Sequence, residues 1–188
     1  MGEIWLTSDW HFNHDREFVF KPRGFDNVGD MNRAIIQRHN ELVLPDDDVY
    51  ILGDLMLGGP DIEKGLSLIT QLKGKLHVIR GNHDTDTRIN AYPTCWNIID
   101  VQDALYLKYK KYHFFLTHYP CYTGNLEKES LHQMTLNLSG HTHSKNKFYN
   151  NLPFIYNVAC DAHNCCPVNI NQIIQDMNEE VENCKFYL

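Results

Sequence analysis

The apolar residues in the first half of the chain fall into three short runs separated by longer amphipathic segments. Residues 3–9, 49–54 and 75–80 have the length and apolar content of buried strands, and each run ends in polar residues. The order strand, helix, strand, helix, strand predicts a parallel sheet with helices packed against it.

Two helices are predicted between these strands. The first is capped by Asp30 and carries apolar residues at helical spacing, at Met31, Ala34, Ile35 and Leu42. The second opens at Gly59-Pro60 and ends at Gly74, a position that glycine favours, and its apolar face is formed by Ile62, Leu66, Ile69 and Leu72.

The second half of the chain is richer in strands. Residues 97–120 contain three short apolar or alternating runs with a hairpin turn near Lys110-Lys111, and residues 135–143 and 154–161 predict two more strands. A closing helix has one apolar face, formed by Ile170, Ile173, Ile174, Met177 and Val181. There is no internal repeat or linker, so residues 1–188 are expected to form one α/β domain of mixed sheets sandwiched by helices.

Composition excludes some functions. The net charge is −7 and the longest basic run is Lys110-Lys111, so no strong nucleic-acid binding is expected, because such binding depends on Lys and Arg neutralising phosphates. No apolar stretch has the length of a membrane span, and no signal peptide precedes the first strand. A cytoplasmic protein without membrane contact is therefore expected. The oligomeric state is left open.

The six cysteines lack the paired C-x-x-C spacing of structural zinc sites and redox motifs. A domain of this size does not need a disulfide framework to be stable. Reduced thiols with mostly structural roles are therefore expected.

Residues able to bind metal ions follow the predicted strands at their carboxyl ends. They are Asp9, His11, Asp54, Asn82, His83, Asp84, His118, His141 and His143. Because the carboxyl ends of parallel strands line one crevice, these side chains are expected to converge. Asp9 and His11 are two residues apart, which in an extended chain places both on one face, and His141 and His143 repeat this spacing. The sequence therefore predicts a metal site at this edge of the sheet.

The number of ligand-type residues favours two ions over one. One ion needs four to six ligands, some of them water. Two ions that lie about 3.5–4 Å apart and share one carboxylate use a larger set of ligands. Nitrogen and oxygen ligands without thiolates favour manganese, iron, nickel or zinc over magnesium or calcium. We expect two divalent metal ions, with manganese as the first candidate, held by Asp9, His11, Asp54, Asn82, His118, His141 and His143.

The other histidines have a simpler interpretation. A lone histidine is more often a hydrogen-bonded residue of the core or surface than a ligand. We expect that role for His39, His77, His113, His132 and His163.

Five short motifs occur in a series that is highly specific as a whole. They are SDWHFNH (8–14), LGD (52–54), GNHD (81–84), THYP (117–120) and GHTH (140–143). In this order and rough spacing they resemble the calcineurin-like metallophosphoesterases, and RGF (23–25), MN (31–32) and residues 157–173 resemble a compact prokaryotic or phage-type branch. The resemblance runs nearly end to end and implies a four-layer α/β/β/α sandwich with a dinuclear site at its edge.

The resemblance also implies a role for each site residue. It places Asp9, His11 and His143 on one ion and Asn82, His118 and His141 on the other, with Asp54 bridging both and His83 acting as the general acid. The implied reaction is hydrolysis of a phosphoester by a hydroxide that bridges the ions. Arg23, Arg80 and His14 are candidates for further contacts to the substrate phosphate.

One position departs from the family pattern. Many family phosphatases carry an aspartate three residues after the bridging one, where it supports the general-acid histidine, and this chain has Leu57 there. Asp84 or Asp161 could orient a histidine instead, although Asp84 could also cap the helix that follows it. The departure weakens any assignment as a protein serine/threonine phosphatase.

Three functions remain open. The leading one is a phosphodiesterase or phosphomonoesterase that acts on small phosphoesters or nucleotides, and the lack of inserted segments over the site favours the diester. The second is a nuclease of the same superfamily, which the net charge of −7 disfavours. The third is a non-catalytic metal-binding interaction scaffold, which is disfavoured because all eight site positions are filled.

Overall fold

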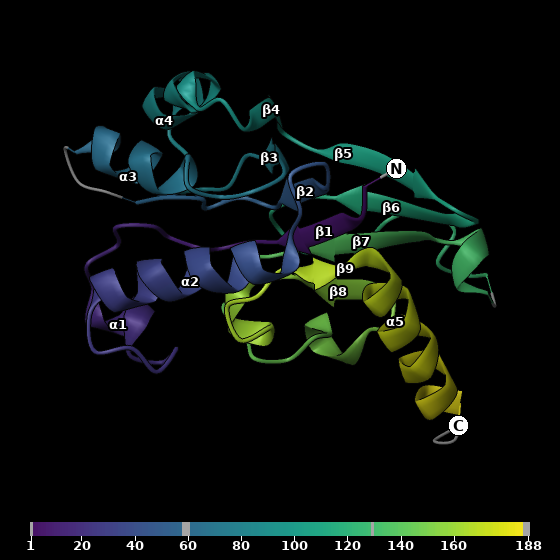
Figure 1. Ribbon diagram of the computed structural model, residues 1–188. Coiled ribbons are helices and arrows are strands. Elements are labelled where there is room, and N and C mark those ends of the chain that lie inside the picture. Colours follow the sequence, from purple (N-terminus) through teal and green to yellow (C-terminus); the bar gives the residue numbers. More distant parts are fainter. Residues whose placement is uncertain (1, 58–60, 129, 186–188) are drawn as a thin grey trace.

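The computed structural model describes residues 2–57, 61–128 and 130–185, and Figure 1 shows its two sheets and the helices around them. The first sheet has the strand order β4-β3-β2-β1-β9, with β1 Ile4–Thr7, β2 Asp48–Ile51, β3 Lys75–Ile79, β4 Ile98–Gln102 and β9 Val168–Asn169. The second sheet has the order β5-β6-β7-β8, with β5 Leu105–Tyr109, β6 Tyr112–Leu116, β7 Thr135–Ser139 and β8 Ile155–Asn157.

Both sheets are mixed. Strands β1 to β4 run parallel and β9 pairs antiparallel with β1, while β6, β7 and β8 run parallel and β5 forms an antiparallel hairpin with β6. The hairpin turns at Lys110, as the alternating pattern of residues 97–120 predicts. Two mixed sheets with flanking helices confirm the expected α/β sandwich.

The helices are α1 Glu17–Phe20, α2 Val28–Leu42, α3 Ile62–Ile69, α4 Asp86–Ala91 and α5 Ile170–Lys185. Short 3-10 helices occur at η1 Tyr92–Thr94, η2 Leu131–Gln133, η3 Tyr149–Asn151 and η4 Cys160–Ala162. None of the helices in the described part of the chain is long and apolar enough to cross a membrane.

The core has two parts, because the strands of the first sheet bury alternate residues on opposite faces. Val49, Ile51 and Val78 pack with Met31 and Ile35 of α2 in one cluster. Leu6 faces the other way, into a cluster formed by the second sheet and α5, with Phe114, Leu116, Leu136, Leu138, Ile173 and Met177. Burial on both faces fixes the first sheet between the helices and the second sheet.

Several predicted boundaries are wrong by a few residues. Helix α2 begins at Val28 because the side chain of Asn27, rather than Asp30, is its N-cap and accepts a hydrogen bond from the Asp30 backbone N at 2.9 Å. Helix α3 ends at Ile69, so Leu72 is buried in the turn that follows it. The predicted helix start at Gly59-Pro60 lies outside the described residues. Helix α1 and strand β9 have no counterpart among the predicted elements.

Candidate metal centre

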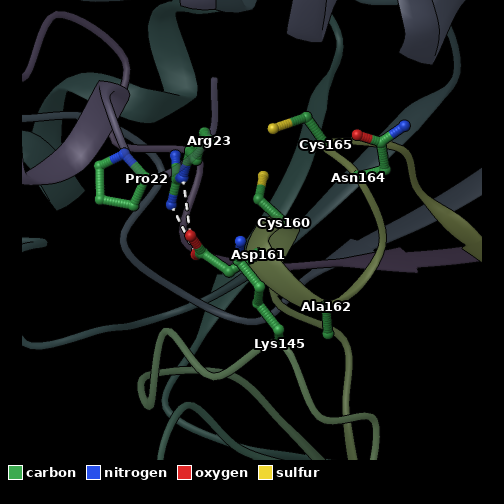
Figure 2. Close-up of a pocket in the computed structure, with 8 residues that line it drawn as sticks. All are labelled: Pro22, Arg23, Lys145, Cys160, Asp161, Ala162, Asn164 and Cys165. Atoms are coloured by element: carbon green, nitrogen blue, oxygen red, sulfur yellow. Dashed lines mark hydrogen bonds and ion pairs between the residues drawn. The ribbon is translucent and has the colours of Figure 1, made fainter. Parts of the chain in front are cut away.

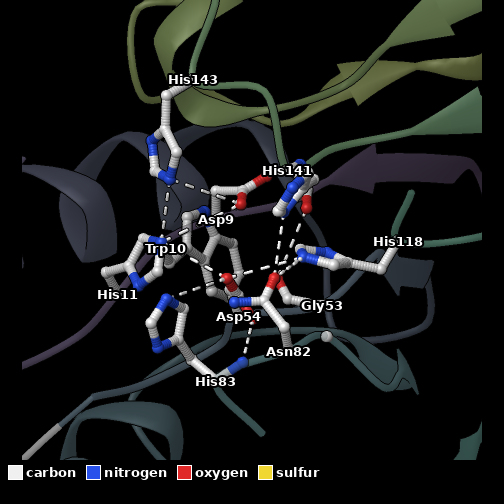
Figure 3. A network of polar contacts seen from close by, with 12 residues as sticks. Asp9, Trp10, His11, Gly53, Asp54, Asn82, His83, His118, His141 and His143 are labelled. Carbon is white, nitrogen blue, oxygen red and sulfur yellow. Dashed lines mark hydrogen bonds and ion pairs between the residues drawn. The ribbon is translucent and has the colours of Figure 1, made fainter. Parts of the chain in front are cut away.

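The loops that follow β1, β2, β3, β6 and β7 meet at one edge of the two sheets, and their side chains point toward a common centre (Figure 3). Backbone hydrogen bonds hold the loops together beyond the strand ends. The backbone N of Asp9 donates to the carbonyl of Gly53, and the backbone N of His11 donates to that of Asp54, both at 3.0 Å. The loop after β7 is joined to the loop after β6 by Gly140 N, which donates to the carbonyl of His118 at 3.0 Å.

Most of the candidate ligands have a left-handed backbone conformation. Positive φ angles occur at Asp9 (58°), His11 (51°), Asp54 (55°), His141 (70°) and His143 (49°). Positive φ angles are uncommon in residues other than glycine. They concentrate at functional sites, where contacts with the surrounding structure stabilise the strained backbone. The strands therefore end earlier than predicted. The prediction that an extended chain places Asp9 with His11, and His141 with His143, on one strand face is wrong. Turns after the strand ends bring each pair together.

Two glycines allow the loops to approach each other. A Cβ atom on Gly81 would lie 2.3 Å from Oδ1 of Asp54, and one on Gly140 would lie 2.3 Å from Oδ2 of Asp9. Both distances are shorter than any side chain could tolerate. These positions therefore need glycine, so that the loops can place their neighbours Asn82 and His141 beside the two aspartates.

The side chain of Asp84 links two of the loops through hydrogen bonds to their backbone. Its Oδ2 accepts hydrogen bonds from the backbone N of Asp54 and of Gly81, both at 2.8 Å, and its Oδ1 accepts one from the hydroxyl of Tyr92 at 2.5 Å. The residue is buried. Asp84 therefore neither orients a histidine nor caps α4; it fixes the positions of Asp54 and Asn82.

One group of candidate ligands is formed by Asp9, His11 and His143. Nε2 of His11 lies 3.1 Å from Nε2 of His143, and these two atoms lie 3.9 and 3.7 Å from Oδ1 of Asp9. Atoms that bind one ion at about 2.1 Å are separated by roughly 3.0–4.2 Å, so the three distances suit a single ion.

A second group surrounds Asn82. Its Oδ1 lies 2.8 Å from Nε2 of His118 and 3.0 Å from Nδ1 of His141. The Nδ1 of His118 donates to the carbonyl of Leu52 at 2.8 Å, so its Nε2 carries the lone pair that a metal ion requires.

Asp54 lies between the two groups. Its Oδ2 is 3.6 Å from Nε2 of His11 and 3.5 Å from Nε2 of His118, while its Oδ1 accepts a hydrogen bond from the backbone N of His83 at 2.8 Å. The side chain is 2% exposed. One carboxylate oxygen therefore faces both groups at nearly equal distances.

The chemistry of the donor set fits divalent ions. Oδ1 of Asp9 is buried without a hydrogen-bond donor, which is unfavourable for a carboxylate unless a cation lies beside it. Burial, with smaller contributions from His143 and Arg23, lowers the pKa of His11 to about 2, so its imidazole is neutral, the form that binds metals. The residues of the two groups could hold one ion each, with Asp54 shared.

Asp161 orients His143, which answers one question that the sequence leaves open. Nδ1 of His143 donates to Oδ2 of Asp161 at 3.0 Å, and this hydrogen bond raises the pKa of His143 against the opposing effect of burial. Hydrogen bonds from His143 and Arg23 outweigh burial and lower the pKa of Asp161 to about 2. Asp161 ends the predicted strand 154–161, so it carries the same signal as the other site residues, a polar group at a strand end.

Arg23 is held behind the centre. Its side chain is 2% exposed and pairs with Asp161 at 2.8 Å, and its guanidinium donates to the carbonyls of Asp9 and Trp10 at 2.8 and 3.2 Å. It lines a separate cavity of about 310 Å³, together with the thiols of Cys160 and Cys165 (Figure 2). In this arrangement the side chain supports the loop of Asp9 and the position of Asp161, and its contact with a substrate phosphate stays a prediction.

The other three candidates differ in their positions. Arg80 forms an ion pair with Asp86 at 2.6 Å, and among the described residues its side chain has no hydrogen bond to a residue of the centre. His14 lies beside the centre, with its ring 5.4 Å from that of His11 and 6.3 Å from that of His83. The His83 side chain is 42% exposed, and its Nε2 lies 4.0 Å from Oδ2 of Asp54. No carboxylate other than Asp54 lies within ion-pair distance of the His83 ring in the described chain.

The expectation for the other five histidines is confirmed by their hydrogen bonds. Each of the five other histidines has a hydrogen-bond partner away from the centre: Lys73 for His39, Asp100 for His77, Tyr106 for His113, Ser130 for His132 and Asn157 for His163. The described cysteines are free thiols, at Cys95, Cys121, Cys160, Cys165 and Cys166.

Comparison with known proteins places the chain in a family. The family model described as calcineurin-like phosphoesterase matches residues 2–145. An uncharacterized protein of Methanocaldococcus jannaschii is 32% identical over 183 residues, which cover 93% of this chain and 91% of that protein. The gene 66 protein of Mycobacterium phage L5 is 27% identical over 168 residues, covering 77% of this chain and 79% of the phage protein.

A solved structure shows the same fold. The crystal structure of a protein of unknown function from Aquifex aeolicus superposes with a TM-score of 0.70 at 20% identity, covering 93% of this chain and 99% of that one. The match of the family model spans the loops of Asp9, Asp54, Asn82, His118 and His143, the same loops that converge in the structure. The chain belongs to the calcineurin-like phosphoesterase family.

Proposed function

We propose that the protein is a dinuclear metal-dependent phosphoesterase that hydrolyses small phosphodiesters. The observation that carries the proposal is the position of Asp54, whose Oδ2 lies 3.6 Å from His11 and 3.5 Å from His118. A carboxylate shared in this way suits a pair of ions held about 3.5–4 Å apart. The nitrogen and oxygen donors suit manganese, iron, nickel or zinc, and manganese is the first to test.

The ions, when bound, would neutralise the phosphoryl oxygens and lower the pKa of a water molecule toward about 7. The chain itself positions the reacting groups. Asp161 and the carbonyl of Leu52 fix the ring orientations of His143 and His118. His83, partly exposed and beside Asp54, would protonate the leaving oxygen, a contribution that is typically 10²–10⁴-fold.

Two features support a diester over a phosphoprotein or a nucleic acid. Tyr119 is 52% exposed and lies 4.5 Å from the ring of His141, while His14 lies at the opposite end of the histidine cluster, beside His11. Organic groups therefore have a surface on both sides of a central phosphate. Arg23 and Arg80 are both paired with carboxylates, which, together with the net charge of −7, disfavours a nuclease.

The test is a paired hydrolysis assay. Protein stripped with a chelator and reloaded with Mn²⁺ is assayed on bis-p-nitrophenyl phosphate and on p-nitrophenyl phosphate, with bound metal counted in the same samples. We expect two ions per chain, no turnover after chelation and a higher kcat/KM for the diester. A preference for the monoester would make the protein a phosphatase. Absence of turnover with two ions bound would overturn the proposal in favour of a non-catalytic scaffold.

A further inference from the structure

A cavity of about 330 Å³ opens beside the metal-ligand groups; it adjoins the cavity in Figure 2, with which it shares Pro22 and Asp161, but the cysteine thiols line only the latter. Its lining includes two candidate ligands, His11 and His143, together with His83 and His14. Its apolar wall consists of Phe18, Val19 and Pro22, from α1 and the turn after it. The cavity therefore adjoins the centre and has both a histidine wall and an apolar wall.

The charges around this cavity disfavour a second phosphate. Its lining includes no lysine or arginine among the described residues, and its one carboxylate, Asp161, has its oxygens engaged by Arg23 and His143. A second phosphoryl group would meet a carboxylate and apolar side chains, and histidines would be its only possible cationic partners, with no permanent positive charge beside it. The group that fits is uncharged.

Phe18 is the most unusual residue of the wall. Its side chain is 73% exposed, although it lies beside a polar centre, and its ring meets the ring of His14 edge to face at 5.5 Å. Its neighbours Val19 and Phe20 are buried in the core and anchor the segment that presents it. An exposed aromatic ring on an anchored segment offers a planar surface to a ligand.

The position of His83 determines which part of a substrate reaches this wall. His83 lines the cavity, and its Nε2 lies 4.0 Å from Oδ2 of Asp54. A leaving oxygen that accepts a proton from His83 would therefore lie beside this cavity. The organic substituent on that oxygen could then enter the cavity, which Phe18 also lines.

We propose that this cavity binds the leaving group of the substrate and that Phe18 selects an uncharged planar group, such as an aryl or nucleoside alcohol. The inference rests on the proposed phosphoesterase function, since it assigns a substrate class to the same centre. A volume near 330 Å³ is at the lower end of the range for small-molecule sites, which suits one such group.

The first experiment measures binding without turnover. Isothermal titration of the Mn²⁺-loaded protein compares phenylphosphonate, methylphosphonate and inorganic phosphate on the wild type and on Phe18→Ala, Phe18→Leu and Ile99→Ala. Ile99 is the matched control, because it is a 55% exposed apolar residue on β4, outside the cavity lining. We expect the wild type to bind phenylphosphonate about tenfold more tightly than methylphosphonate, as a contact with an aromatic ring would provide.

The variants should separate the aromatic contact from the contact with metal. Phe18→Ala should reduce the preference for phenylphosphonate to less than about threefold, and Phe18→Leu should give an intermediate value. Inorganic phosphate, which is too small to reach Phe18, should bind all four proteins alike. Equal binding of the two phosphonates by the wild type would overturn the inference.

The second experiment distinguishes the leaving group from the group that stays on phosphorus. Bis-p-nitrophenyl phosphate and methyl p-nitrophenyl phosphate share a leaving group but differ in the other substituent. If Phe18 contacts the leaving group, Phe18→Ala lowers kcat/KM for both esters by the same factor, about tenfold. A loss confined to the bis ester would overturn the assignment.

The two proposals fail in different ways. If the wild type hydrolyses neither ester, the proposed function fails. If it hydrolyses both and Phe18→Ala equals the wild type, the function stands and only the leaving-group site is wrong. The 73% exposure of Phe18 means that its replacement should leave the unfolding midpoint close to that of the wild type.

Discussion

Asp161 accepts a hydrogen bond from Nδ1 of His143 at 3.0 Å, and this contact turns Nε2 of His143 toward His11. The same carboxylate is paired with the guanidinium of Arg23, which in turn donates to the carbonyl of Asp9. Asp161 thus holds His143 directly and holds Asp9 through Arg23, which donates to the backbone carbonyl of Asp9. Such outer partners usually tune metal affinity strongly.

Asp161→Asn should therefore weaken binding at the site of Asp9, His11 and His143. We expect a 10–100-fold loss of affinity for the weaker-bound Mn²⁺ ion, measured by competition with a chelating dye. Asp86→Asn is the control, because Asp86 forms an ion pair with Arg80 but is 82% exposed. An affinity equal to that of the wild type would show that His143 is oriented without Asp161.

Asp54→Asn tests the dinuclear arrangement. Replacing the shared carboxylate with an amide removes the negative charge between the two groups, so both metal content and turnover should fall, turnover by more than about 100-fold. Metal analysis after gel filtration gives the stoichiometry, and Asp103→Asn, at an exposed carboxylate, is the control. Two bound ions together with full activity in Asp54→Asn would contradict the model of a shared carboxylate.

His83→Ala tests the general acid. The ring of His83 is 42% exposed and is not a member of either group of candidate ligands, so metal content should stay near that of the wild type. Turnover should fall about 10²–10⁴-fold for esters with poor leaving groups and less for p-nitrophenyl esters, which need little protonation on departure. Equal losses on both kinds of ester would argue against proton donation by His83.

Tyr92→Phe tests the contact that holds the loops of Asp54 and Asn82. Tyr92 is fully buried, and its hydroxyl donates to Asp84. Removing that donor should lower the free energy of unfolding by about 2 kcal/mol, as is typical of hydrogen bonds to charged groups. Urea unfolding of the stripped protein measures it, with Tyr106→Phe, at a 56% exposed tyrosine, as the control. A change below about 0.5 kcal/mol would show that Asp84 is held by the backbone donors alone.

His39 should make stability depend on pH. Burial lowers its pKa to about 4, against the opposing effect of its hydrogen bond to the Lys73 carbonyl. The unfolded chain then binds the proton first, so stability present above pH 6.5 is lost as the pH falls toward 4. The protonation of His39 in the unfolded chain should lower the free energy of unfolding by about 2 kcal/mol between pH 7 and pH 5.

Urea unfolding at pH 7 and pH 5 checks this expectation. His39→Gln keeps a donor near the Lys73 carbonyl but does not titrate, so its stability should change less between the two pH values than that of the wild type. His132→Gln, at an exposed histidine, should show the wild-type dependence. The same pH dependence in wild type and His39→Gln would mean that other groups produce it.

The order of the elements and the set of candidate ligands could be predicted from the sequence. Strands β1, β2 and β3 and helices α2 and α5 have local apolar patterns that need no knowledge of the rest of the chain. The ligands follow strand ends, and parallel strands bring their ends to one edge. For the same reason the sequence could have indicated Asp161, since it ends a predicted strand as well.

Only the tertiary structure decided how those residues are used. The left-handed turns at Asp9 and His11 depend on hydrogen bonds to the loop after β2, and the pairing of Arg23 with Asp161 joins residues 138 positions apart. Helix α1 has four residues, too few for a periodic pattern, yet it places Phe18 beside the centre. A local sequence pattern indicates which residues favour a strand, a helix or a metal ion. The partner of each side chain is set by contacts between distant segments, and these contacts exist only in the folded chain.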